Sequence, residues 1–118
     1  MEIISYKDLT VWQRSIELVR AVYQLTHQFP REELYGLTSQ MKRASVSIPS
    51  NIAEGKTRGT RVDYRRFLIN AFGSGSELET QVIIVKQLQF GRHLDYSQVD
   101  NLLEEVMRML NVLIRKLS

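Results

Sequence analysis

Apolar residues recur every three or four positions along four stretches of the chain. This is the period of an α-helix with one buried face, and none of the four shows the strict alternation of a half-buried strand. The connections between the stretches are short, so consecutive helices should run antiparallel. We expect an all-α protein, an up-down-up-down four-helix bundle, with helices at about 8–29, from 31–37 to 53 or 54, 61–90 and 98–117.

Proline and glycine punctuate this pattern. Pro30 should end the first helix, because proline disfavours helical backbone in the residue before it. Gly55 is placed as a C-terminal cap for the second helix. Pro49 lies within the second helix, where apolar spacing continues on both sides, so we expect a kink at this position rather than a break.

Helix starts carry a second local signal. Ser or Thr followed three places later by an acidic residue resembles a capping box, in which side chains accept hydrogen bonds from free amides of the first turn. Three of the four starts have this arrangement with Asp in the acidic place: Ser5 with Asp8, Thr60 with Asp63, and Ser97 with Asp100.

The first and fourth helices each carry two apolar stripes, although a bundle helix needs only one. Either each helix presents a wide arc to a single core, or the second stripe packs against another copy of the protein. An exposed apolar patch of this size on a monomer favours aggregation, so we expect a homo-oligomer. The stripes are Leu9, Trp12, Ile16, Val19, Tyr23 and Val11, Leu18, Val22, Leu25, Phe29 in the first helix, and Val99, Leu102, Val106, Met109, Leu113 and Leu103, Met107, Leu110, Ile114, Leu117 in the fourth.

Composition limits the class of protein. The 118 residues are 43% hydrophobic with six Gly and two Pro, as expected for one folded domain over 1–118. There is no Cys, so disulfides, thiol catalysis and thiolate metal sites are excluded. The N-terminal residues do not resemble a signal peptide, and no apolar run is long enough to span a membrane. We expect a soluble, cytoplasmic protein without membrane contact.

Candidate catalytic groups are sparse. His27 and His93 lie near predicted helix ends, and neither forms a recognisable catalytic or metal-binding motif. The glycine-rich run 73–76 lacks the preceding strand and the lysine of a phosphate-binding loop. Its glycines are better explained by close helix packing, with 44–47 as the expected counterpart. We expect no enzymatic activity, no catalytic residue, no metal and no cofactor.

A polar stripe runs beside the apolar stripe of the second helix, through Arg43, Ser47, Asn51 and Glu54. Side chains at this position should be partly buried and need hydrogen-bond partners, which the third helix can supply. A structural polar network that sets helix register or subunit contacts is the first interpretation. A ligand pocket is the alternative.

Positive charge is concentrated where the second helix passes to the third. Residues 42–66 carry seven basic and two acidic side chains, 7 − 2 = +5, whereas the other 93 residues carry 9 − 11 = −2. The cluster is either a solvated surface or a site for the phosphate backbone of nucleic acid, repeated in an oligomer. The period assigns Tyr64 and Phe67 largely to the core, so base stacking is not expected. The candidate nucleic-acid-binding residues are Lys42, Arg43, Lys56, Arg58, Arg61, Arg65 and Arg66.

Three strings carry a family resemblance: DLTVWQRSIEL, YGLTSQMKRASVSIPSNIAEGKTR and RRFLINAFGSGSELETQ. With them the chain resembles the four-helix-bundle family of bacterial 23S rRNA intervening-sequence proteins, which is similar to the accessory variability proteins of diversity-generating retroelements. The resemblance implies an antiparallel bundle that assembles into a ring, typically a pentamer. It places the polar motif of the family at Arg43, Ser47, Asn51, Glu54, Gly55 and Arg58.

Two functions are consistent with these features. The first is a non-enzymatic, oligomeric accessory protein that binds the RNA or DNA backbone through the basic cluster. The second is a homo-oligomeric scaffold that recruits a protein partner, such as a reverse transcriptase, without binding nucleic acid itself.

Overall fold

The computed structural model describes residues 5–118, and helices make up most of this part of the chain. No strand occurs within it. The prediction of an all-α protein with four long helices is therefore confirmed. The long helices are α1 (Thr10–Thr26), α2 (Leu37–Arg58), α3 (Arg61–Gln87) and α4 (Ser97–Lys116), and three short 3₁₀ helices accompany them, η1 (Tyr6–Asp8), η2 (Arg31–Glu33) and η3 (Gln89–Gly91).

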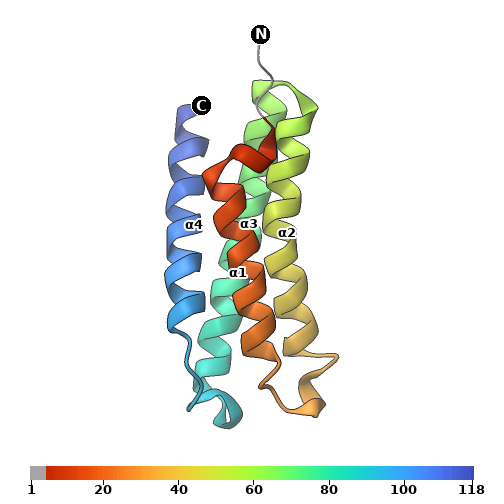
Figure 1. The fold of residues 1–118 in the computed structure, drawn as a ribbon, viewed down its shortest axis with the longest axis vertical. Helices are drawn as coiled ribbons and strands as arrows, with labels where there is room; N and C mark the ends of the chain where they lie inside the picture. The colour runs from red at the N-terminus through yellow and green to blue at the C-terminus, as the bar shows by residue number, and fades with distance from the viewer. Residues whose placement is uncertain (1–4) are drawn as a thin grey trace.

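The four helices lie side by side in an elongated body of 52 × 21 × 19 Å. Consecutive helices run in opposite directions, and the turn between α2 and α3 lies at the same end as the C-terminus (Figure 1). The most extensive helix contact is between α2 and α3, while α4 packs on both α1 and α3. This arrangement brings the end of α4 next to the turn between α2 and α3.

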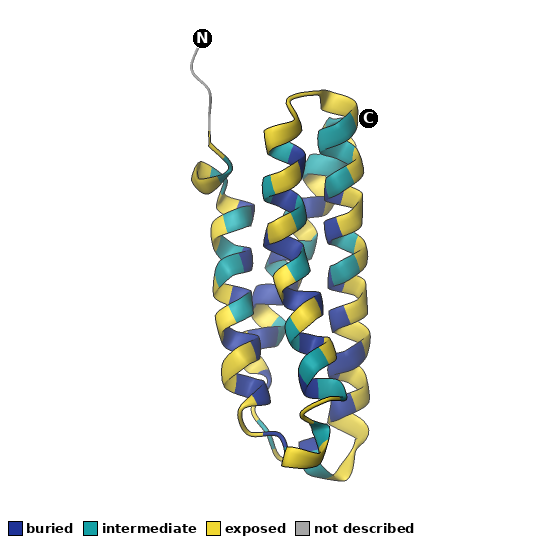
Figure 2. Ribbon diagram, turned by 90° about the vertical axis from the view of Figure 1, so that its right-hand side faces the viewer, coloured by how far each residue is buried: buried dark blue, intermediate teal, exposed yellow. Residues whose placement is uncertain are grey.

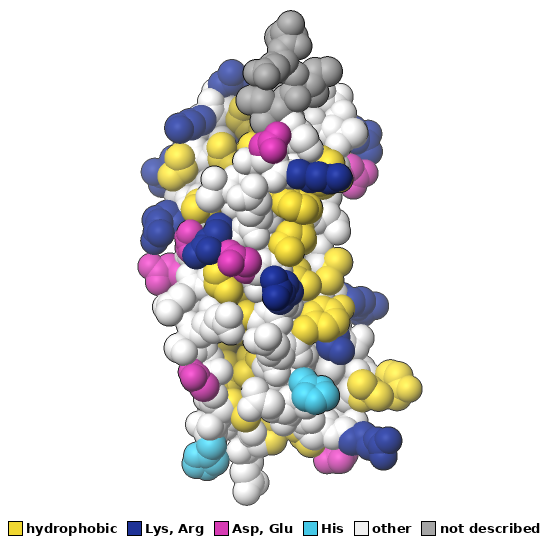
Figure 3. All heavy atoms as spheres, viewed as in Figure 1, with side chains coloured by type: hydrophobic (Ala, Val, Ile, Leu, Met, Phe, Trp, Pro, Cys, Tyr) yellow, Lys and Arg dark blue, Asp and Glu magenta, His cyan; other side chains and the backbone are white. Residues whose placement is uncertain are grey.

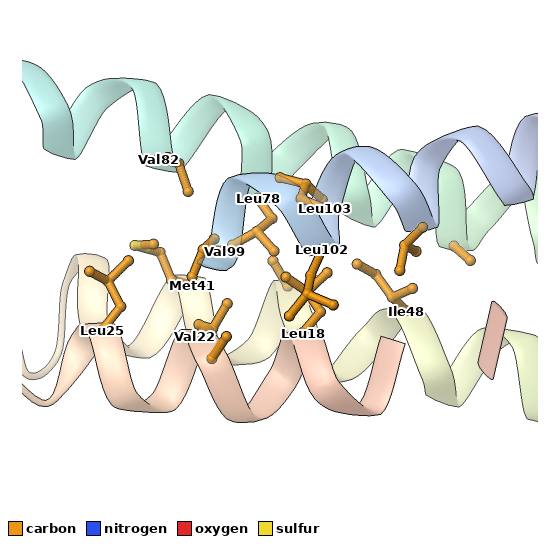
Figure 4. Close-up of a cluster of buried hydrophobic side chains, with 14 of the residues drawn as sticks. Leu18, Val22, Leu25, Met41, Ile48, Leu78, Val82, Val99, Leu102 and Leu103 are labelled. Carbon is orange, nitrogen blue, oxygen red and sulfur yellow. The ribbon is translucent and has the colours of Figure 1, made fainter. Parts of the chain in front are cut away.

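The core is formed by the inward faces of all four helices, and the outer faces are exposed (Figure 2). Side chains from α1, such as Leu18 and Val22, point toward Met41 of α2 and Leu102 of α4 (Figure 4). α2 and α3 each bury one apolar face almost completely, as expected from the helical period of their apolar residues. Their buried members are Met41, Ala44, Ile48, Ile52, Leu68, Ala71, Leu78, Val82 and Val85.

The two stripes of α1 have different environments. The stripe through Leu18 and Val22 is buried, whereas Trp12 and Ile16 of the other are half-buried and Tyr23 is 45% exposed. In α4 both stripes contribute buried residues, because the helix packs on both α1 and α3. Val99, Leu102, Leu103, Val106 and Leu110 are buried, and Met107 and Met109 are half-buried. A wide arc facing one core thus explains both stripes of α4, because Leu113, Ile114 and Leu117 also pack against the core while staying half-buried. It does not explain Tyr23 on the outer stripe of α1, which is exposed.

The end of α2 differs from the prediction. Gly55 is not a cap but lies inside α2, which continues to Arg58. Gly59 ends the helix with a φ of 85°, a left-handed conformation that glycine adopts without steric cost. Pro49 is buried within α2, and helix extends on both sides of it. The kink at Pro49 stays a prediction.

Other helix ends were only partly predicted. Thr60 caps α3, since its Oγ1 accepts a hydrogen bond from the amide of Asp63 at 3.1 Å. Ser5 caps η1 instead of α1, with the amide of Lys7 as its donor. Ser97 does not cap α4. Its own backbone amide instead donates to the carboxylate of Asp95, two residues earlier in the chain, at 3.0 Å.

The first and third helices are also shorter than expected. α1 ends at Thr26 and α3 at Gln87, each about three residues before the predicted end. The apolar residues beyond these ends, Phe29 and Phe90, pack edge to face with ring centroids 5.2 Å apart. Their periodicity therefore reflects a contact between residues that follow α1 and α3, with Phe90 in η3, and not a continuation of the two α-helices. No helix in the described residues is long and apolar enough to cross a membrane.

Candidate nucleic-acid interface

The seven basic residues predicted as one cluster do not lie together. Lys42 and Arg43 precede Lys56 on α2 by 13 residues or more, which is about 20 Å of helix. The ammonium of Lys42 lies 4.6 Å from the ring centroid of Tyr23 on α1. The structure separates these two side chains from the other five.

The other five lie at the turn between α2 and α3, where the C-terminal end of α4 joins them. The guanidinium of Arg61 donates to the carbonyl of Lys116 at 2.7 Å, which places Arg115 and Lys116 beside the turn. We call these seven residues the basic end: Lys56, Arg58, Arg61, Arg65, Arg66, Arg115 and Lys116.

The basic end has a net positive charge. The segments that form it, 54–66 and 115–116, contain seven basic side chains against Glu54 and Asp63, so 7 − 2 = +5. Lys and Arg side chains gather along the edge formed by α4, toward the end of the chain, in Figure 3. Sequence reasoning missed the contribution of α4. The antiparallel order of the helices was the signal that could have revealed it.

Arg61 and Arg65 hold the end of α4. Arg61 donates from Nε to the carbonyl of Leu117 at 3.1 Å and from Nη2 to that of Lys116, and Arg65 donates from Nε to the carbonyl of Ile114 at 3.1 Å. The last carbonyls of a helix have no partner within it and carry the negative end of its dipole. These two arginines therefore cap α4, a structural role that the sequence did not predict.

Arg58 and Arg66 extend from the two helices toward Phe67. Their Cζ atoms lie 5.1 and 5.0 Å from the centroid of the Phe67 ring. Each guanidinium also pairs with a carboxylate on its own helix, Glu54 at 3.1 Å and Asp63 at 3.2 Å. Both arginines remain largely exposed, with 49% and 60% of the side chain accessible.

Aromatic side chains are therefore interleaved with basic ones at this end. The ammonium of Lys56 lies 5.2 Å from the ring centroid of Tyr64, and burial raises the pKa of that tyrosine. Tyr64 and Phe67 are both half-buried, and Tyr64 packs against the core as its spacing predicted. Because both residues lie close to the turn between α2 and α3, the ring of Tyr64 is next to Lys56 and the ring of Phe67 is next to Arg58 and Arg66.

The polar stripe of α2 is divided. Ser47 Oγ lies 2.8 Å from Ser74 Oγ on α3, and the amide nitrogen of Asn51 donates to Ser47 Oγ at 3.0 Å and to its carbonyl at 2.8 Å. Arg43 and Glu54 are exposed and do not join this group, and Glu54 pairs instead with Arg58. Two of the four predicted residues thus form a connection between α2 and α3.

A small polar groove opens beside this connection. It is lined by Gln40, Arg43 and Ser47 of α2 and by Glu77 of α3. Arg43 therefore faces the rim of a surface groove.

The glycine-rich run of α3 packs differently from the prediction. A Cβ on Gly75 would lie 2.2 Å from the sulfur of Met107 on α4, so the close neighbour is a side chain of α4 and not the backbone of α2. A Cβ on Gly73 would meet nothing within 4 Å. Ser74, between them, is the residue that contacts α2.

A separate apolar groove lies between α1 and α4. Met109 and Val112 of α4 line it with Val11 of α1, and Val112 is 45% exposed. We call it the α1–α4 groove; its lining residues are Leu9, Thr10, Val11, Arg108, Met109, Val112 and Leu113. Its stripe members Leu9, Met109 and Leu113 are half-buried, and Val112, which lies outside both stripes of α4, is exposed.

Comparison with known proteins adds a family to this description. The family model described as 23S rRNA-intervening sequence protein matches residues 7–112, which include α1, α2, α3 and most of α4. No curated protein matches the chain.

Proposed function

The chain belongs to the family of 23S rRNA-intervening sequence proteins, and we propose that it is a non-enzymatic, homo-oligomeric protein that binds the backbone of RNA or DNA through its basic end. The observation that carries this proposal is the net charge of +5 contributed by three helix ends at one pole of the bundle. Family membership is consistent with an RNA-associated role.

The basic end suits phosphate groups rather than base edges. Lys56, Arg58, Arg66 and the two basic residues of α4 lie near the ends of three different helices, and not along one face of a single helix. Contacts of this kind position a nucleic acid without reading its sequence. Binding should therefore show weak sequence preference and a steep dependence on salt, because neutralised phosphates release counterions.

Fluorescence anisotropy with labelled RNA tests this proposal. We expect binding at about 50 mM salt that weakens by orders of magnitude at about 200 mM. The variant Lys56→Gln/Arg66→Gln/Lys116→Gln should reduce the slope of log K against log salt by about 2 to 3. Arg61 and Arg65 are left unchanged because they cap α4.

Arg92→Gln is the matched control, since Arg92 is exposed in the loop before α4, at the opposite end of the bundle. It should leave both affinity and slope almost unchanged. The proposal fails if RNA and DNA do not bind at the lower salt concentration, or if the triple variant binds as tightly as the unchanged protein.

A homo-oligomer would strengthen such binding. Each added copy brings another basic end, and linked sites bind a long nucleic acid more tightly than one site does. The apolar lining of the α1–α4 groove supports association of this kind, because Leu9, Met109 and Leu113 are only half-buried there and Val112 is exposed.

The alternative function is a scaffold for a protein partner such as a reverse transcriptase. Exposed apolar side chains on the outer face of α3 favour it, namely Val62, Ile69, Ile83 and Ile84. A partner that co-purifies after nuclease treatment, and is lost on changing Ile83 to Glu, would support the scaffold. Loss of the partner on nuclease treatment would support the nucleic-acid function.

A further inference from the structure

The side chain of Phe67 packs against the backbone of α2 at Gly55. A Cβ on Gly55 would lie 2.6 Å from Cβ of Phe67, so the side chain of Phe67 rests directly against the backbone of α2. The residue is half-buried, and the guanidinium groups of Arg58 and Arg66 approach the ring from α2 and α3. The ring therefore gives both arginines a common support.

Each of these guanidinium groups also forms a hydrogen-bonded ion pair with a carboxylate on its own helix. Glu54 accepts a hydrogen bond from Arg58, and Asp63 accepts one from Arg66. Ion pairs with exposed carboxylates contribute little stability, but here they limit the orientations of a planar group that already contacts a ring. More than two-fifths of each arginine side chain remains accessible.

From this arrangement we infer that the basic end binds single-stranded nucleic acid in preference to duplex, with unpaired bases stacked on the guanidinium planes of Arg58 and Arg66. The inference rests on the proposed function and adds the class of nucleic acid. Guanidinium planes and aromatic rings are the usual stacking surfaces for unpaired bases. In a duplex the faces of the bases are covered by their neighbours, so only the phosphates are available.

The surrounding charges fit the same substrate. Lys56 lies beside Tyr64, and Lys116 lies at the end of α4 beside Arg61. These cations are placed to contact phosphates on either side of a stacked base. A flexible single strand can follow such a curved end, whereas a duplex is stiff over this length.

Replacing both arginines by lysine separates stacking from charge. Arg58→Lys/Arg66→Lys keeps the net charge but removes the planar groups. Three labelled probes with the same number of phosphates are compared by anisotropy at about 50 mM salt: a single-stranded RNA, an abasic single strand and an RNA duplex. The unchanged protein should bind the RNA strand best.

We expect the double variant to bind the RNA strand at least tenfold more weakly, which corresponds to the loss of one stacked base or more. It should bind the abasic strand and the duplex as before. Arg92→Lys, a matched change at the opposite end, should alter none of the three. Phe67→Leu, which keeps an apolar side chain on Gly55, should reduce RNA binding in the same direction, with circular dichroism to verify helix content.

Each other outcome overturns the inference. Equal loss on all three probes means that the arginines contact phosphates only, and the proposed function then survives without stacking. If the unchanged protein binds the duplex as tightly as the single strand, the arginines likewise contact phosphates only, and the proposed function survives without stacking. If none of the probes binds, the proposed function fails as well.

Discussion

Gly55 shows how much one hydrogen atom in place of a side chain can matter in this bundle. A Cβ there would lie 2.6 Å from Cβ of Phe67 and 3.3 Å from the carbonyl oxygen of Tyr64, whereas a Cβ on Gly73 of α3 would meet nothing within 4 Å. Both glycines lie inside helices, where alanine is otherwise favoured. They therefore form a matched pair for substitution.

We expect Gly55→Ala to lower the free energy of unfolding by about 1 to 3 kcal/mol, because the close contact forces α2 and α3 apart. Gly73→Ala should raise it by about 0.5 to 1 kcal/mol, because alanine loses less conformational entropy in a helix. Urea denaturation followed by circular dichroism measures both. Changes of the same sign in the two variants would contradict this account of Gly55.

Glu105 connects α4 to α1 through Arg14. The guanidinium donates from Nε and Nη2 to the two carboxylate oxygens at 3.0 and 2.8 Å, and this hydrogen bonding lowers the pKa of Glu105. A carboxyl group whose pKa is lower in the folded state stabilises folding above its unfolded pKa, about 4.3. That contribution is lost as the pH falls toward the folded value.

We therefore expect Glu105→Gln to lower the free energy of unfolding at neutral pH. Below about pH 4 the free energies of unfolding of the variant and the unchanged protein should become more similar. Urea unfolding across this pH range measures the difference. Glu104→Gln is the control, since its carboxylate lies 3.6 Å from Arg108 on the exposed side of α4. A Glu105→Gln deficit that stays constant with pH would mean that the pair contributes by packing alone.

At the scale of the helices, the last turn of α4 is held by hydrogen bonds from α3. Its final carbonyls accept hydrogen bonds from Arg61 and Arg65 of α3, and its last residues are half-buried or exposed. The positive guanidinium groups also oppose the negative end of the helix dipole. The end of α4 is thus held by charge-assisted hydrogen bonds in addition to the partial burial of Leu113, Ile114 and Leu117.

We expect Arg61→Gln/Arg65→Gln to let the last turn of α4 fray. Amides near residue 117 should exchange with solvent about tenfold faster, which corresponds to roughly 1.4 kcal/mol, while those of α2 keep their protection. Hydrogen exchange followed by NMR resolves the two regions. Arg66→Gln removes a charge from the same end without touching α4, and faster exchange in that variant too would point to general electrostatics.

At the scale of the whole molecule, the α1–α4 groove is an apolar surface that one bundle leaves partly open, with Leu9, Met109 and Leu113 half-buried and Val112 exposed. We expect light scattering to give a mass that is a multiple of 13.8 kDa, and the family resemblance favours five copies. Val112→Glu should shift this mass toward a single chain, because a charge would enter a buried contact. Val112 is 45% exposed in the isolated chain.

Val46→Glu is the matched control for the groove. Val46 is 40% exposed on the outer face of α2, so the substitution is similar in exposure but lies on another surface. Dissociation by Val46→Glu and not by Val112→Glu would place the contact elsewhere. A single chain at every concentration across a tenfold dilution would rule out the oligomer.

The sequence alone determined the features that depend on local periodicity. The number of helices, the buried faces of α2 and α3, and the cap at Thr60 follow from side chains within a few residues of one another. These signals are short in range, and tertiary contacts did not override them. The family resemblance rested on the same local strings.

Only the tertiary structure decided which distant residues meet. The role of Gly55 depends on where Phe67 lies, and the grouping of Lys116 with Arg61 depends on how far α4 extends along the bundle. The separation of Lys42 from the turn depends on helix length, because residues near in sequence are carried apart by 1.5 Å per residue. Periodicity defines the apolar face of each helix, but it does not define which helices become neighbours or how they are rotated against each other. The grouping of basic residues at the basic end and the packing of Phe67 against Gly55 are therefore decided by the tertiary structure.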